Sequence, residues 1–175
     1  MNTTNQIIAF EYLTKKITGL WQSVGTVFEM NGKKPNINFR NFSKSTAAHH
    51  YREFKITNEK GDTLLKTTYD GSGVSPKYSI ETATLKAEVN NHDRNSKVTL
   101  TEHIMGSKLS EIQYASNGKQ IITPENQLKM LEPFTKDDVD AIIDKFKKDM
   151  PQEVVQKMHL PWVRPHITKG IFERY

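Results

Sequence analysis

The central part of this chain, from residue 51 to residue 123, alternates short runs of strand-forming residues with turn sequences. Glycine and asparagine mark the turns, as in Asn58-Glu-Lys-Gly61 and Ser116-Asn-Gly118. No helix-like pattern separates the runs, which argues against a parallel α/β sheet, because parallel strands need long crossover connections. The sequence therefore predicts an antiparallel meander. Its strands are expected at Tyr51–Thr57, Asp62–Tyr69, Lys77–Val89, Lys97–Ile104, Leu109–Ala115 and Lys119–Thr123.

Two segments that flank this meander are also predicted as strands. Leu20–Met30 alternates, with Phe28 on one face, and it ends at the strong turn sequence Asn31-Gly32. Residues 33–48 are polar and irregular, and we expect a long loop there, of the kind that often serves as a lid or binding loop. Ile167–Tyr175 is predicted as the final strand.

Helical periodicity occurs towards both ends of the chain. Apolar residues recur every three or four positions in residues 5–17, and Gly19 follows in the usual position of a helix C-terminus. Thr135–Asp138 has the spacing of a capping box, and an apolar stripe continues through Val139–Met150. Pro151–Met158 predicts a second, shorter helix, because proline is favoured at the first helical position.

Two short signatures lie at the ends of the predicted sheet. Thr18-Gly-Leu-Trp21 precedes the first strand, and Phe172-Glu-Arg-Tyr175 closes the last one. A Gly-x-Trp at one end and an arginine at the other suggest a barrel whose ends meet, with a guanidinium over an indole face. Together with the meander, these residues resemble the lipocalin-like (calycin) superfamily in its bacterial form.

The resemblance implies a mostly β fold, an antiparallel up-and-down barrel with a short N-terminal helix and an amphipathic helix before the last strand. It implies structural roles for Trp21 and Arg174, which would pack on each other, and a cup that binds a small hydrophobic molecule. The chain is then one domain, residues 1–175. Its parts would be an N-terminal helix at 1–18, a strand meander at 19–123, a helical insertion at 124–161 and a closing strand at 162–175.

Composition narrows the classes of partner and chemistry. The chain has no cysteine, which excludes disulfides, thiolate metal sites and cysteine nucleophiles. Its net charge is +5, but the basic residues are spread along the chain, so nucleic acid is not the expected partner. No stretch approaches the roughly 20 apolar residues of a membrane span. Met1–Gln6 shows no signal peptide, so we expect a soluble, basic, cytoplasmic protein unless the chain is a mature form.

Five aromatic residues in the predicted strands form the candidate ligand-binding set: Phe28, Phe54, Tyr69, Tyr78 and Tyr114. A barrel of about eight strands leaves room for one small ligand. A phenol can orient a polar group of such a ligand within an apolar wall. Each of these aromatic residues, taken singly, is better explained as a core residue than as a ligand contact. We therefore expect only that part of the set faces the cavity.

The six histidines show no metal-binding spacing, and neither a metal nor a cofactor is expected. His103 alternates with apolar residues, and with Glu102 or with Glu111 of a neighbouring strand it is a candidate general base, although a surface histidine is far more common. His166-Ile-Thr168 resembles one of the two motifs with which two-histidine phosphoesterases grip a phosphate. The sequence holds only one copy, so this function is rejected unless a symmetric partner exists.

Three functions are compatible with these sequence features. The leading expectation is non-catalytic binding of a small hydrophobic or amphipathic molecule in the cavity. The second is an enzyme of the isomerase or cyclase type in the same cavity, with a tyrosine or histidine as the acid–base group and no specific catalytic residue assigned. The third is a protein-interaction module that engages an anionic or protein partner through its basic surface and the 33–48 loop.

Overall fold

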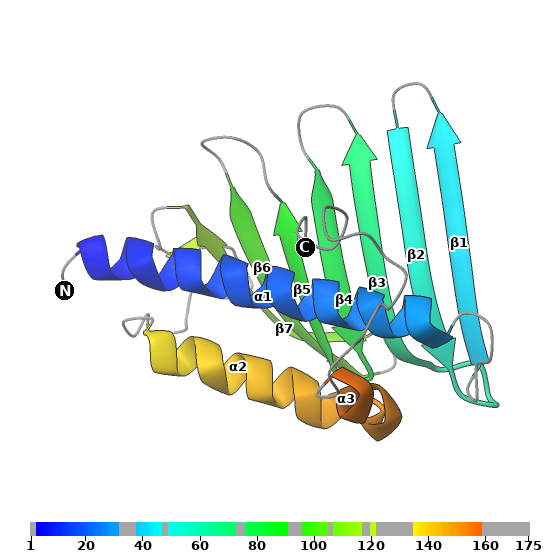
Figure 1. Ribbon diagram of the computed structural model, residues 1–175. Coiled ribbons are helices and arrows are strands. Elements are labelled where there is room, and N and C mark those ends of the chain that lie inside the picture. Colours follow the sequence, from blue (N-terminus) through cyan, green and yellow to red (C-terminus); the bar gives the residue numbers. More distant parts are fainter. Residues whose placement is uncertain are drawn as a thin grey trace, which may run out of the picture.

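The computed structural model describes residues 3–31, 38–46, 49–72, 76–90, 96–104, 107–116, 120–121 and 135–158. These residues form an eight-stranded antiparallel sheet and three helices, α1 (Thr3–Asn31), α2 (Lys136–Asp149) and α3 (Gln152–Met158). Figure 1 shows α1 running across the strands, with α2 beside it and α3 following α2.

Each strand of the sheet pairs with the next strand along the chain. The predicted antiparallel meander is therefore confirmed. In chain order the strands are β1 (Asn38–Thr46), β2 (His49–Thr57), β3 (Thr63–Ser72), β4 (Lys77–Thr82), β5 (Leu85–Asn90), β6 (Lys97–Ile104), β7 (Ser107–Ala115) and β8 (Gln120–Ile121).

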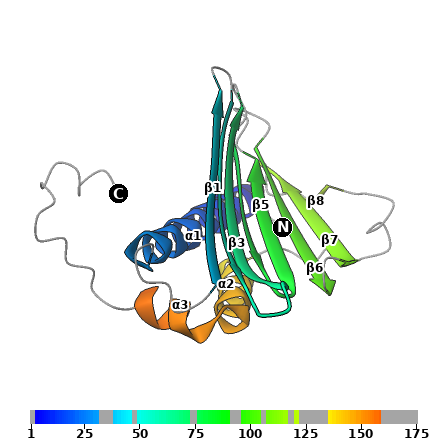
Figure 2. The same ribbon diagram turned by 90° about the vertical axis from the view of Figure 1, so that its right-hand side faces the viewer.

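The sheet is open, so the expected closed barrel is wrong for the described part of the chain. The strand order begins at β1 and ends at β8, and within the described strands no pairing joins these two edges. Figure 2 shows the strands fanning apart from β1 to β8. The physical reason is that α1 lies against the face that a closed barrel would turn inward, while β8 contributes only two residues to the last pairing.

Helix α1 is longer than its sequence pattern predicts. The strand expected at Leu20–Met30 is wrong, and Gly19 does not end the helix, because both lie inside Thr3–Asn31. Apolar side chains continue at helical spacing beyond Gly19, so one stripe of the helix faces the core. The buried residues of that stripe are Leu13, Ile17, Leu20, Val24, Val27 and Phe28. A helical glycine costs about 1 kcal/mol relative to alanine, and burial of one leucine contributes about 1.5–3 kcal/mol.

The face of the sheet that packs against α1, here called the inner face, is apolar. Its fully buried residues are Ile56, Leu65, Ile80, Ala87, Val89 and Val98. Intervening residues point to the other face, where Lys66 pairs with Glu53 at 3.4 Å and Lys77 pairs with Glu88 at 3.3 Å. Exposed ion pairs contribute about 0–1 kcal/mol each, so burial of the inner face is what holds the helix to the sheet.

Two further boundaries differ from the prediction. Strand β1 lies inside the loop expected at 33–48, and it pairs with β2 along its whole length. The asparagine, serine and lysine residues of β1 are not typical of strands, so its sequence does not predict one. Its backbone pairing with β2 makes this segment a strand. The strand expected at Lys77–Val89 is two strands, β4 and β5, which turn at Ala83-Thr84 without the glycine or asparagine that marks the other turns.

The predicted helices of the C-terminal part are confirmed. Thr135 and Asp138 form the capping box: the Thr135 hydroxyl accepts from the Asp138 N–H at 3.2 Å, and the Asp138 carboxylate accepts from the Thr135 N–H at 2.8 Å. Helix α3 follows Pro151 as expected. The Tyr12 hydroxyl donates to the Asp140 carboxylate at 2.6 Å, which joins α1 to α2.

Several predicted features lie outside the described residues. They are the final strand Ile167–Tyr175 with its Arg174, and the motif at His166. In the described ranges, no helix combines the length and the apolar character needed to cross a membrane.

Candidate functional site

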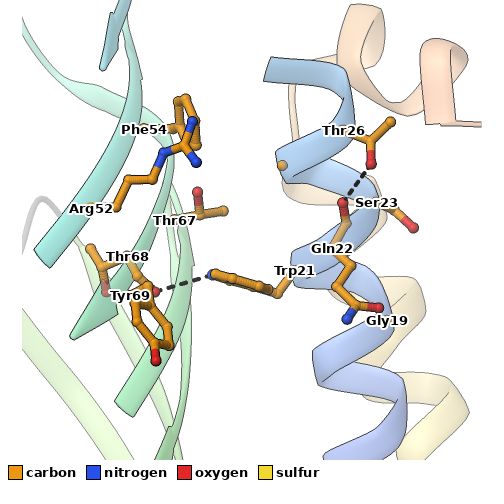
Figure 3. Close-up of a pocket in the computed structure, with 11 residues that line it drawn as sticks. Gly19, Trp21, Gln22, Ser23, Thr26, Arg52, Phe54, Thr67, Thr68 and Tyr69 are labelled. Atoms are coloured by element: carbon orange, nitrogen blue, oxygen red, sulfur yellow. Dashed lines mark hydrogen bonds between the residues drawn. The ribbon is translucent and has the colours of Figure 1, made fainter. Parts of the chain in front are cut away.

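A hollow of about 630 Å³ lies between the C-terminal half of α1 and strands β2 and β3. Figure 3 shows the helix on one side, the strands on the other, and the Trp21 side chain reaching from the helix towards the strands. The volume falls within the range of about 300–1,000 Å³ that is typical of small-molecule sites. We call this site the Arg52 hollow. It is lined by Gly19, Trp21, Gln22, Ser23, Gly25, Thr26, Arg52, Phe54, Thr67, Thr68 and Tyr69.

Trp21 is a fixed wall of the Arg52 hollow. Its indole N–H donates to the backbone carbonyl of Thr68 at 3.1 Å. Its ring lies 6.3 Å from that of Tyr69 and 5.5 Å from that of Tyr78, centroid to centroid. The two tyrosines face each other across β3 and β4. A hydrogen bond and two ring contacts therefore hold the indole in one orientation between the helix and the sheet.

Arg52 supplies the charge of this hollow. Its guanidinium carbon lies 4.5 Å from the centre of the Phe54 ring, and Phe54 stacks on Phe28 at 5.0 Å with 10° between the ring planes. A cation over an aromatic face gains about 0.5–2 kcal/mol. Among the described residues that line the hollow, Arg52 is the only side chain with a formal charge. The hollow thus combines aromatic walls, hydroxyl groups and one cation.

Two glycines of α1 keep the hollow open. A Cβ atom built at Gly19 or at Gly25 meets nothing within 4 Å. Both positions line the hollow, so any larger side chain there would extend into it or along its rim. The space therefore depends on the residues of the helix as well as on those of the strands.

A second hollow, of about 640 Å³, lies along the N-terminal half of α1. We call it the Lys15 hollow. The Thr18 and Tyr78 hydroxyls are hydrogen-bonded within it at 2.5 Å. It shares Gly19 and Gln22 with the Arg52 hollow. Its full lining is Phe10, Glu11, Thr14, Lys15, Thr18, Gly19, Gln22, Tyr78, Val89 and Ser96.

The structure brings four of the five candidate aromatic residues together. Phe54 and Tyr69 line the Arg52 hollow, and Tyr78 lines the Lys15 hollow. Phe28 lies on α1 rather than on a strand and is buried behind Phe54. Their contact with a ligand stays a prediction.

Tyr114 lies apart from this group. It is on β7 and lines a smaller hollow of about 180 Å³ between the sheet and α2, together with Ile142 and Phe146. Burial of its phenol, together with the nearby Asp138 carboxylate, raises the pKa of Tyr114 above its ordinary value. The five residues therefore do not all line one hollow.

His103 lies away from both hollows beside α1. It is buried, and its Nε2 lies 3.4 Å from the Leu85 carbonyl oxygen. The carboxylates expected beside it have other neighbours, since Glu102 accepts from Ser110 at 3.4 Å and Glu111 pairs with Lys108 at 3.8 Å. Among the described residues, no group of three or more histidine, aspartate or glutamate side chains is placed to hold a metal ion.

A polar cluster near His103 joins α2 to the β4–β5 turn. The Asp149 carboxylate accepts from the Thr82 hydroxyl at 2.6 Å, and from the Thr84 N–H and hydroxyl at 2.8 and 2.9 Å. Partial burial acts to raise the pKa of Asp149, but these hydrogen bonds and the nearby His103 outweigh it, so the pKa lies below its ordinary value of 3.8. We call these residues the Asp149 cluster, and all of its contacts hold structural elements together.

The sequence pattern does not single out Arg52 or Gly25 as site residues, and it assigns Trp21 to structure and Gly19 to a helix end. Arg52 carries a usable signal, because it alternates with Phe54 and Ile56 and so lies on the apolar face of its strand. A charged residue on the inner face of a strand indicates either a buried partner or a ligand. Gly25 carries no such signal, because its role depends on α1 continuing past Gly19.

No protein-family model matches this chain, and neither a curated protein nor a solved structure is significantly similar to it.

Proposed function

We propose that this protein binds a small hydrophobic or amphipathic molecule in the Arg52 hollow. The observation that carries the proposal is the lining of that hollow: the aromatic rings of Trp21, Phe54 and Tyr69, with hydroxyl groups and one guanidinium among them. Small-molecule sites characteristically combine a mostly apolar wall with a few placed polar groups. The volume of about 630 Å³ suits a ligand of ordinary metabolite or lipid size.

Binding is preferred to catalysis because of the chemistry of the same lining. Its described residues supply rings, hydroxyls, an amide and a guanidinium, all of which hold and orient a ligand. An isomerase or cyclase also needs an acid–base group within hydrogen-bond reach of the reacting atoms, and the described lining residues offer one phenol, that of Tyr69, and no carboxylate or imidazole. The lipocalin-like resemblance implies the same class of ligand, but Trp21 lies on α1 rather than at the start of a strand, so the proposal rests on the lining of the hollow.

A pair of substitutions at Gly25 tests the proposal. Gly25→Leu should fill the hollow. Gly25→Ala is its control, because it also replaces glycine with a residue that favours the helix but adds only one methyl group, in open space. The probe is Nile red, a neutral dye whose emission rises in apolar sites. Native mass spectrometry of the untreated wild-type protein shows any retained molecule.

The wild-type protein and Gly25→Ala should bind the dye with equal affinity, and Gly25→Leu should lose most of it. Unchanged dye binding by Gly25→Leu would place the dye elsewhere and contradict the proposal. Circular dichroism of all three proteins shows whether the fold is kept. Loss of binding therefore counts only when the helical signal is that of the wild type.

A further inference from the structure

Strand β1 forms one edge of the open sheet. It pairs with β2 at all nine of its positions, from Asn38 to Thr46, and no described strand pairs with its other side (Figure 1). In an antiparallel sheet, alternate residues of a strand direct their backbone N–H and C=O groups to opposite sides. The outer side of β1 therefore carries a row of backbone donors and acceptors with which a further extended chain can pair.

The sequence and geometry of β1 leave this edge open to strand addition. Edge strands are commonly protected by being short, by a proline or by a bulge. Strand β1 has nine residues, contains no proline and pairs with β2 without a register shift. It does carry positive charge, at Arg40 and Lys44, and it contains no acidic residue. Charge is therefore the feature of β1 that decides which chain can add to it.

These charges disfavour a second copy of the chain as the added strand. Two antiparallel copies of β1 that overlap along their full length pair about Phe42, so Arg40 of each copy lies opposite Lys44 of the other. Like charges directly opposite each other destabilise a strand pair. An acidic chain instead gains an attraction at the same two positions.

Strand β2 extends the positive charge inward from the edge. Arg40 lies in register with Lys55 of β2, on the face of the sheet opposite to the inner face. The acidic neighbour on β2, Glu53, already pairs with Lys66 of β3 at 3.4 Å. An acidic residue on a strand added beside β1 therefore approaches basic residues and a carboxylate that has its own partner.

We infer that the β1 edge binds an extended acidic segment of another protein, which adds to the sheet as a further strand. Backbone hydrogen bonds to β1 supply the affinity, and acidic residues opposite Arg40 and Lys44 select the partner. The inference is independent of the proposed function, because no β1 residue is among the described residues that line the Arg52 hollow.

The test uses a nine-residue peptide of alternating valine and threonine, in which glutamate replaces two threonines four positions apart, the spacing of Arg40 and Lys44. Fluorescence anisotropy of the labelled peptide measures binding. Wild-type protein should bind it about tenfold more tightly than the same peptide with lysine in place of glutamate. A third peptide keeps the glutamates but has two adjacent prolines between them, which removes a backbone donor whichever edge of the peptide faces β1. It should bind about tenfold more weakly, and equal binding would overturn strand addition.

Variants of the protein test the two basic residues. Arg40→Gln combined with Lys44→Gln should remove the preference for the glutamate peptide over the lysine peptide. Lys145→Gln combined with Lys148→Gln is the matched control, because it removes the same charge from exposed positions of α2 and should keep the preference. A preference that survives in the β1 variant, or that falls equally in both variants, overturns the assignment to this edge. Circular dichroism shows whether both variants keep the fold.

Self-association is the competing use of the same edge. Sedimentation velocity of the wild-type protein should show no dimer that the glutamate peptide dissociates. Such a dimer would assign the β1 edge to a second copy and overturn the acidic partner. Failure of all three peptides to bind overturns the inference as well, and it leaves the proposed function standing, since Nile red binding is measured separately.

Discussion

The two places where a helix meets the sheet differ in how completely they are packed. At the Arg52 hollow, α1 presents glycines to strands β2 and β3 and leaves about 630 Å³ of space. At the Asp149 cluster, α2 ends in three hydrogen bonds to the β4–β5 turn, and Phe146 of the same helix is buried. The hollow between α2 and the sheet is only about 180 Å³, so the two junctions differ in the amount of space they leave and not in whether they leave any.

The largest expected effect compares two phenylalanines, one at each junction. Phe146→Ala should lower the free energy of unfolding by about 3–5 kcal/mol, because the Phe146 side chain is buried and the hollow that it borders is only about 180 Å³. Phe54→Ala should cost less, by about 1 kcal/mol or more, because Phe54 lines the larger Arg52 hollow, so its side chain is less completely surrounded by the core. Chemical denaturation of both variants measures the difference. Equal losses would show that the Arg52 hollow is packed as tightly as the α2 junction.

The Asp149 cluster should contribute less than the core beneath it. Asp149→Ala removes a carboxylate that accepts three hydrogen bonds, and we expect a loss of about 2 kcal/mol in the free energy of unfolding. Asp144→Ala is the control, because Asp144 is exposed on the same helix, and its change should stay within about 0.5 kcal/mol. Similar values for the two variants would mean that the cluster does not hold α2 to the sheet.

Acidification should remove part of the stabilisation that the Asp149 carboxylate provides. The pKa of Asp149 is lower in the folded protein than its ordinary value of 3.8, so its stabilisation is fully present above about pH 4 to 5 and is lost as the pH falls through the folded-state pKa. The stability difference between the wild type and Asp149→Asn should therefore shrink from pH 6 to pH 3. Denaturation curves at several pH values measure this difference. A difference that grows on acidification would contradict a lowered pKa of Asp149 in the folded protein.

The parts of the fold that the sequence predicts well are those whose signal is local. The capping box at Thr135 and Asp138 needs only four residues, and its helix lies where the pattern predicts it. The meander is equally accessible, because each pairing joins neighbours in the chain. Strand β1 escapes prediction because its pairing with β2, and not its polar sequence, makes it a strand.

Helix α1 shows why the candidate site is predictable only in part. Thr26, Phe28 and Met30 fall on one face of an extended chain, and Gly19 occupies a helix-ending position, so the local pattern favours a strand. Packing against the inner face decides for the helix, and the sequence records that packing in the helical spacing of Leu20, Val24 and Phe28. Phe54 and the tyrosines can be found by their alternation along a strand, whereas the glycines become site residues only when the helix continues past them.

The smallest expected effect tests whether the space beside α1 is real. Alanine at Gly19 or at Gly25 adds a Cβ that meets no atom within 4 Å. It also restricts the unfolded chain, so less conformational entropy is lost on folding than with glycine. Each variant should therefore raise the free energy of unfolding by about 0.5–1 kcal/mol, which thermal or chemical denaturation can resolve. A loss of stability in either variant would mean that something occupies the flank of α1, and the contrast between the open junction and the more closely packed one would not hold. If both variants gain stability, the glycines weaken the helix and leave space beside it, as the proposed binding site requires.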